Sequence, residues 1–97
     1  MRVLIRREAK EDLRGALAWY EEKRRGLGGE FRAQLGATLS TIRSNPQLYA
    51  EVFSPVRRAP LRRFPYGVYY QLRGAAVEVL AILHQARDPR VWQSRAP

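Results

Sequence analysis

The first half of the chain contains two stretches with the hydrophobic spacing of amphipathic helices. The apolar positions of the first stretch, which starts at Glu8, are Ala9, Leu13, Ala16, Leu17 and Tyr20. Those of the second stretch, which follows Gly28-Gly29, are Phe31, Leu35, Leu39 and Ile42. The second stretch ends near Asn45-Pro46, because the residue before a proline disfavours helix. The glycine-rich turn between them predicts an antiparallel helix hairpin.

A period of two replaces the helical period in the second half of the chain. Val68, Tyr70 and Leu72 alternate with more polar residues, which is typical of a strand with one buried face. Residues 77–83 are almost all apolar and suit a central strand that is covered on both faces. Turn-forming residues at 65–67 and 73–74 bound these two strands.

Two further strands complete the predicted sheet. Residues 1–6 form a short first strand, with Val3 and Ile5 on one face. An arginine-rich strand precedes residue 65, and Pro60 within it predicts an edge strand or a bulge. We therefore predict a single α+β domain over residues 1–97. It consists of an N-terminal strand, the antiparallel helix hairpin and a three-stranded antiparallel meander, whose apolar face the hairpin covers.

Composition narrows the chemistry that is available to the chain. It contains no cysteine and one histidine, so we expect no disulfide, no thiolate nucleophile, no metal site and no cofactor. Its longest apolar run, residues 75–83, is interrupted by Glu78 and is far shorter than the about 20 residues that span a bilayer. The first residues do not have a signal-peptide pattern. We expect a cytoplasmic protein without membrane contacts.

The net charge points to an anionic partner. Eighteen basic residues against nine acidic ones give a formal charge of +9, and sixteen of the basic residues are arginine. Such an excess predicts attraction to nucleic acid, the ribosome or an acidic protein. Arginine also makes bidentate contacts to carboxylates and phosphates. A GC-rich genome explains the preference for arginine over lysine equally well, so the functional signal is the net charge.

Several short fragments of the sequence occur in a characteristic order. In the predicted helices these are Ala9, Asp12, Leu13, Tyr20, Phe31, Leu35 and Asn45-Pro46. In the second half they are Val56-Arg57-Arg58, Phe64-Pro65-Tyr66, Val68-x-Tyr70, Leu83-His84, Arg87-Asp88-Pro89 and Trp92-x-x-Arg95. Each fragment alone is unspecific, but their order and spacing together resemble the RelE/ParE toxin superfamily, and its ParE branch in particular. The resemblance covers nearly the whole chain and implies the same α+β fold.

The resemblance implies one of two activities. Ribonuclease members sit in the ribosomal A site and cut messenger RNA by attack of the 2′-hydroxyl on the adjacent phosphate, which requires acid–base catalysis and cationic stabilisation. ParE-like members bind DNA gyrase and stall it without catalysis of their own. Ribonuclease members carry an arginine three positions before a tyrosine of the third strand. If Tyr70 corresponds to that tyrosine, this chain has Gly67 in place of the arginine. Trp92 stands near their C-terminal catalytic tyrosine, and an indole cannot act as a base.

Four arginines that flank Pro60 form the first candidate binding surface: Arg57, Arg58, Arg62 and Arg63. Neighbouring side chains of a strand point to opposite faces, so at most half of these arginines share one surface. They either meet the target and the antitoxin, or protect an edge strand from aggregation by their charge. The sequence favours neither interpretation.

Aromatic residues supply further candidates. Tyr70 shares a face with Val68 and Leu72 and is predicted to lie in the core, whereas Tyr66 and Tyr69 are predicted interface residues. Trp92 either completes the core or anchors a partner. A tryptophan at the margin of the first helical stripe, Trp19, is expected to be partly exposed.

The last candidates follow the central strand. His84 ends that strand, and an imidazole can transfer protons near neutral pH, but a lone histidine at a strand end favours a structural role. Arg87 is the best single functional candidate, because the resemblance implies a basic residue after this strand. Asp88 either orients Arg87 or belongs to an Asp-Pro turn with a surface ion pair. Arg95 and Trp92 complete the predicted binding set.

We therefore predict the toxin of a type II toxin-antitoxin pair that binds DNA gyrase. Its predicted partner is a cognate antitoxin with an acidic, partly disordered C-terminal segment that folds over the hairpin and the sheet. The pair is expected to form a hetero-oligomer that contacts operator DNA only through the antitoxin. One alternative is a ribosome-dependent endoribonuclease that cuts mRNA with Arg62 or Arg63, His84 and Arg87. Another is a plain nucleic-acid-binding module with steeply salt-dependent DNA affinity.

Overall fold

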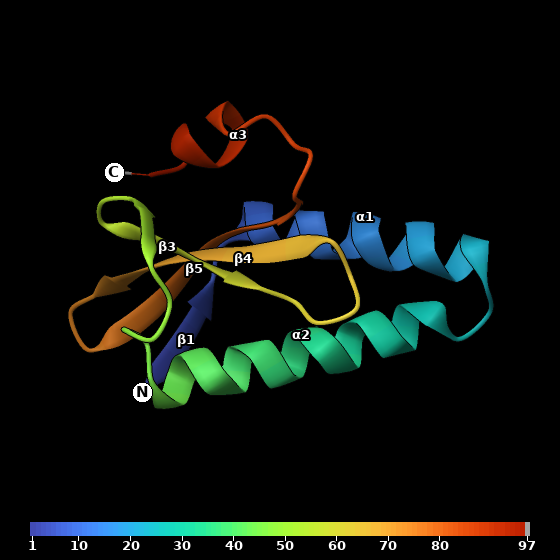
Figure 1. Cartoon of the computed structure of the whole chain (residues 1–97), viewed down its shortest axis with the longest axis horizontal. Helices are drawn as coiled ribbons and strands as arrows, with labels where there is room; N and C mark the ends of the chain where they lie inside the picture. Colours follow the sequence, from blue (N-terminus) through green and yellow to red (C-terminus); the bar gives the residue numbers. More distant parts are fainter. Residues whose placement is uncertain (97) are drawn as a thin grey trace.

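The computed structural model describes residues 1–96, which form a five-stranded sheet, two long helices and a short C-terminal helix (Figure 1). The elements in chain order are β1 (Arg2–Ile5), α1 (Arg7–Lys23), α2 (Leu27–Ser44), β2 (Glu51–Phe53), β3 (Val56–Pro60), β4 (Tyr66–Arg73), β5 (Ala76–His84) and α3 (Arg90–Gln93). The strand order is β1-β5-β4-β3-β2, and β1 runs parallel to β5 while the other pairs are antiparallel. The predicted α+β class, with its N-terminal strand, helix hairpin and antiparallel meander, is confirmed. None of the described helices is long and apolar enough to cross a bilayer.

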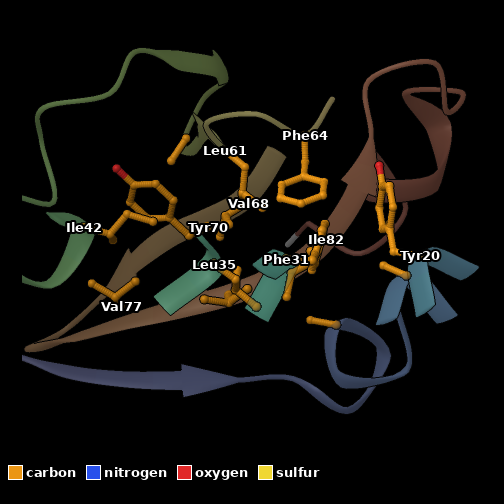
Figure 2. Close-up of a cluster of buried hydrophobic side chains, with 14 residues drawn as sticks. Tyr20, Phe31, Leu35, Ile42, Leu61, Phe64, Val68, Tyr70, Val77 and Ile82 are labelled. Atoms are coloured by element: carbon orange, nitrogen blue, oxygen red, sulfur yellow. The ribbon is translucent and has the colours of Figure 1, made fainter. Parts of the chain in front are cut away.

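Each face of the sheet carries its own apolar cluster. The helix hairpin covers one face, and the core there includes Phe31, Leu35, Ile42, Phe64, Val68, Tyr70 and Val77 (Figure 2). The C-terminal segment with α3 covers part of the other face, where the cluster consists of Val56, Tyr69, Leu80, Ala81, Leu83 and Trp92. The predicted core position of Tyr70 is confirmed, because its ring is fully buried and its hydroxyl donates to the carbonyl of Pro46 at 2.6 Å.

The turn between the two long helices is shorter than predicted. Because α2 begins at Leu27, Gly28 and Gly29 lie in its first turn and not in the connection. The free N–H groups of a helix N-terminus need acceptors, and Glu21 of α1 supplies one. Its carboxylate accepts hydrogen bonds from the N–H groups of Gly26 at 2.9 Å and Gly28 at 3.0 Å, which lower the pKa of Glu21. Gly26 itself has a φ of 89°, which a glycine adopts without a steric cost.

The arginine-rich segment also differs from the prediction. β3 ends at Pro60, and Arg62 and Arg63 lie in the irregular turn before β4, where Arg63 has a φ of 70°. The predicted edge position holds only for the end of β3, because the short strand β2 pairs with Val56 and Arg57 and leaves Pro60 without a partner on that side within the described residues. β2 spans only Glu51–Phe53 and is exposed throughout, so it has too few positions to produce a recognisable alternation.

Candidate functional site: a groove along α1

Two adjoining cavities form a groove between α1 and the ends of β4 and β5. Their volumes are about 310 Å³ and about 500 Å³, and both are lined by Gly15, Tyr66 and His84. The α1 residues along the groove are Glu11, Asp12, Gly15, Ala16, Trp19 and Tyr20. Their spacing places them on one side of the helix, and Gly15 leaves the middle of the groove open because a methyl group there would meet no atom within 4 Å.

Tyr66 forms the inner wall of the groove. It is the first residue of β4 and lies opposite His84 of β5. Its ring packs edge-on against Phe31, with centroids 5.0 Å apart, and against His84, with centroids 5.4 Å apart. Burial raises the pKa of Tyr66, and the nearby charge of Arg87 offsets part of this rise. The phenol therefore remains protonated at neutral pH and acts as a hydrogen-bonding group.

His84 is held by a hydrogen bond within its own turn. Its Nδ1 accepts the N–H of Ala86 at 3.0 Å. In a neutral imidazole that accepts through Nδ1, the proton lies on Nε2, which is then a donor. Neither nitrogen is left as a free base in this arrangement. The contact agrees with the structural role that a histidine at a strand end favours.

Arg87 stands at the polar end of the groove. Its backbone N–H donates to the carbonyl of His84 at 3.0 Å, which fixes the turn after β5. Within residues 1–96 its guanidinium has no hydrogen bond or ion pair. Asp88 does not orient Arg87; it pairs with Arg90 at 2.6 Å, and this pairing lowers the pKa of Asp88. Arg87 is therefore a cation that is available to a partner.

Asp12, in contrast, is fully engaged. Its Oδ2 accepts the N–H of Ile82 at 3.0 Å and a guanidinium N–H of Arg95 at 2.7 Å. Arg95 also donates to the carbonyl of Leu80 at 3.1 Å. β5 extends past the end of β1, so its outer edge lacks a strand here, and these two side chains satisfy the exposed backbone groups instead. Arg95, a predicted binding residue, is thus a mostly buried anchor of the C-terminal segment.

The opposite face of the sheet holds a second group of predicted residues. Arg58 lies against Gly67, and its Nε donates to the hydroxyl of Tyr69 at 3.2 Å. The Tyr69 ring stacks on Trp92, with centroids 5.0 Å apart. Tyr69 and Trp92, both candidate binding residues, are only 7% and 6% exposed and pack into the apolar cluster on this face. C-terminal residues that the alternation pattern does not reveal cover this face of the sheet.

Gly67 gives the first mutational prediction. In Gly67→Ala the new methyl group would lie 2.5 Å from Nε of Arg58, so the guanidinium must move away from Tyr69. Because the obstacle is the end of a flexible side chain, we expect a loss of only about 1 kcal/mol in the free energy of unfolding. Urea titration measures this loss. In the Gly67→Ala background, the further substitution Arg58→Ala should lower the free energy of unfolding only slightly more. If Gly67→Ala alone loses several times the expected amount, its methyl group clashes with the backbone and not with the Arg58 side chain.

The four arginines around Pro60 do not form one surface. Arg57 and Arg58 point to opposite faces, as predicted: Arg57 donates to the carbonyl of Tyr49 at 2.7 Å on the helix side of the sheet. Arg63 pairs with Glu30 of α2 at 2.6 Å, and this hydrogen bond contributes most to the lowered pKa of Glu30. Arg62 is exposed and lines a separate cavity beside α2.

Three predicted residues thus meet in the groove, namely Tyr66, His84 and Arg87. The sequence analysis missed the contribution of Gly15 and Glu11, which carry no motif, although the helical spacing from Asp12 could have located them. Trp19 is 52% exposed at the apolar end of the groove, as expected. Over residues 1–96, no three His, Cys, Asp or Glu side chains lie close enough together to hold a metal ion.

The α+β fold and the groove along α1 define a class of protein, the small toxins of the RelE/ParE type. The sequence matches the family model of the ParE toxin of the type II toxin-antitoxin system parDE over residues 3–89, so the chain belongs to the ParE toxin family. A solved structure of the chromosomal ParDE toxin-antitoxin system from P. aeruginosa is similar, with a TM-score of 0.77 and 17% sequence identity. The superposition covers 87% of this chain and 95% of that one, and at this identity it supports the fold alone. No curated protein matches the sequence.

Proposed function

We propose that this ParE-type toxin arrests bacterial growth by binding DNA gyrase in the cytoplasm, without catalysing a reaction. The observation that carries the proposal is the match to the ParE family model over residues 3–89. Members of that branch stall gyrase by binding it, whereas ribonuclease members of the superfamily carry acid–base residues. The groove along α1, with Arg87 at its polar end and Trp19 at its apolar end, is the proposed contact surface.

The chemistry of the groove supports binding over strand cleavage. Attack by a 2′-hydroxyl requires a group that removes its proton. Nδ1 of His84 already accepts a hydrogen bond, burial raises the pKa of Tyr66, and Asp12 is neutralised by Arg95. Arginine and tryptophan, which stand at the two ends of this groove, are instead residue types that are enriched at protein interfaces.

A cognate antitoxin is the second proposed partner, because the family acts in parDE pairs. We propose that an acidic, partly disordered C-terminal segment of the antitoxin neutralises this chain in a hetero-oligomer, and that operator DNA is contacted only through the antitoxin. The net charge of +9 supports an acidic partner. A segment that folds as it binds can cover a large surface of a small toxin.

Arg87→Ala tests the proposed contact. We expect the purified variant to inhibit gyrase supercoiling only at about tenfold higher concentration, the loss expected when an interface arginine is removed. Its thermal unfolding should be unchanged, because the guanidinium has no partner within the described chain. Arg32→Ala, which removes an exposed arginine from α2 and the same charge, is the matched control and should inhibit like the wild type.

Two other outcomes would replace the proposal. Cleavage of messenger RNA on ribosomes by the wild-type chain, lost in Arg87→Ala, would establish the endoribonuclease alternative. Steeply salt-dependent DNA binding by the free chain, without growth arrest on expression, would indicate a plain nucleic-acid-binding module.

A further inference from the structure

β1 is an edge strand whose outer side is open. It pairs only with β5, in parallel, from Arg2 to Ile5. The N–H of Arg6 donates to the carbonyl of Val79 at 3.1 Å. Because strand groups alternate in direction, the backbone of Leu4 also faces β5, whereas the N–H and C=O groups of Val3 and Ile5 face outward.

An apolar cavity lies directly beside this open edge. It has a volume of about 340 Å³ between β1 and α2, and it is lined by Val3, Ile5, Gly36, Leu39, Ser40 and Arg43. Figure 1 shows β1 running next to the C-terminal half of α2. A methyl group at Gly36 would meet no atom within 4 Å, so the helix leaves room there for a side chain from elsewhere.

The β1 edge is less protected than the opposite edge of the sheet. Proteins shield sheet edges with proline, bulges, charged side chains or very short strands. β2, at the other edge, has three residues and an irregular register. β1 has only four residues and includes the charged Arg2, but it has a regular register and no proline, and its residue Leu4 is 41% exposed. This edge therefore has the properties of a strand-pairing site.

We propose that an extended segment of an acidic protein adds a strand to the outer edge of β1. Its alternate side chains would be apolar and would enter the cavity above Gly36, as in other strand-addition complexes. Arg43 lines the cavity and Arg2 belongs to β1, and both positive charges favour carboxylates in the segment. A second copy of this chain fits less well, since two chains of charge +9 would bring these arginines together. The inference rests on the proposed function, in which the acidic partner is the cognate antitoxin.

Gly36→Leu fills the cavity and tests the proposal. The probe is the protein encoded by the reading frame that abuts this gene, purified and titrated against the chain. We expect Gly36→Leu, which blocks the anchor position, to lower the affinity of the probe protein for the chain about tenfold. Co-expression of the probe protein should also rescue cells from growth arrest less well. Gly29→Leu is the matched control, because Gly29 lies two helical turns earlier on α2 with open space around it and outside the cavity.

Amide hydrogen exchange gives a second, direct measurement. In the free chain the amides of Val3 and Ile5 should exchange fast and that of Leu4 slowly, because only Leu4 donates to β5. In the complex the Val3 and Ile5 amides should become protected. Gly36→Leu should weaken this protection, while leaving gyrase inhibition by the free chain unchanged.

Two results would overturn the inference. The first is a complex in which the Val3 and Ile5 amides stay unprotected and Gly36→Leu binds like the wild type. The second is a free chain that already dimerises and protects both amides, which would assign the edge to a second copy. Neither result would affect gyrase inhibition by the free chain. If the free chain fails to inhibit gyrase, the proposed function is rejected, but the exchange experiment still tests strand addition at β1.

Discussion

Replacing Asp12 with alanine is expected to lower the free energy of unfolding by ~3–5 kcal/mol, a large share of the stability of a domain of this size. The Asp12 side chain is only 10% exposed and its partner Arg95 17%. Removal of the carboxylate leaves the guanidinium of Arg95 without a counter-charge and the N–H of Ile82 without an acceptor. Both penalties arise because these groups are shielded from water in the folded chain.

Urea titration and a double-mutant cycle with Arg95→Ala would measure this effect. The double variant should lose less than the sum of the two single variants, because both groups of the pair are then gone. Asp88→Ala is the control, since Asp88 forms an exposed ion pair with Arg90 that contributes less than ~1 kcal/mol. If Asp12→Ala and Asp88→Ala lower the free energy of unfolding equally, the buried Asp12–Arg95 pair contributes no more to stability than the exposed Asp88–Arg90 pair.

The same pair determines where the C-terminal segment lies. Arg95 joins this segment to α1 through Asp12 and to β5 through the carbonyl of Leu80, and Arg6 donates to the carbonyl of Arg95 at 3.0 Å. Trp92 then packs on Tyr69 and covers the second face of the sheet. Residues 90–96 lie beyond the range matched by the family model, and in this chain the contacts of Arg95 and Trp92 hold them in place.

The sequence predicted the elements that have a long regular period. Alternation around Val68 and Tyr70 located β4, although both faces of this strand are buried and not one. The helical stripe through Leu13 and Tyr20 located α1, because a period that is repeated several times exceeds the noise of single residues. The three residues of β2 and the four of α3 contain little more than one repeat each, which is too short to recognise. The start of α2 was misplaced because Glu21, in another helix, caps it.

The sequence predicted only the part of the candidate site that lies in recognisable local patterns. Tyr66, His84 and Arg87 belong to fragments with a recognisable order, and they do meet in the groove. The pairing of Asp12 with Arg95 joins residues 83 positions apart, and no local pattern encodes it. Side-chain contacts between distant elements therefore set the limit of the sequence analysis.

Phe31→Ala is expected to produce the other large loss, ~3–5 kcal/mol in the free energy of unfolding, as for other buried aromatic residues. Phe31 is fully buried and its ring packs against Tyr20, Phe64 and Tyr66, at centroid distances of 5.4, 5.1 and 5.0 Å. Figure 2 shows Phe31 together with Tyr20 and Phe64. The cavity would remove dispersion contacts from all three rings at once. Because Tyr66 forms the inner wall of the groove, gyrase inhibition should also weaken although Arg87 is intact.

Thermal and urea unfolding would measure the stability loss, and the supercoiling assay below the unfolding temperature would measure the loss of inhibition. Phe53→Ala is the control, because Phe53 is 52% exposed on β2 and should cost less than ~1 kcal/mol. Phe31→Leu, which leaves a smaller void, should lie between the two. If Phe31→Ala unfolds like Phe53→Ala, the aromatic cluster does not support the groove. If it loses stability but inhibits gyrase fully, Tyr66 does not depend on Phe31 for its position.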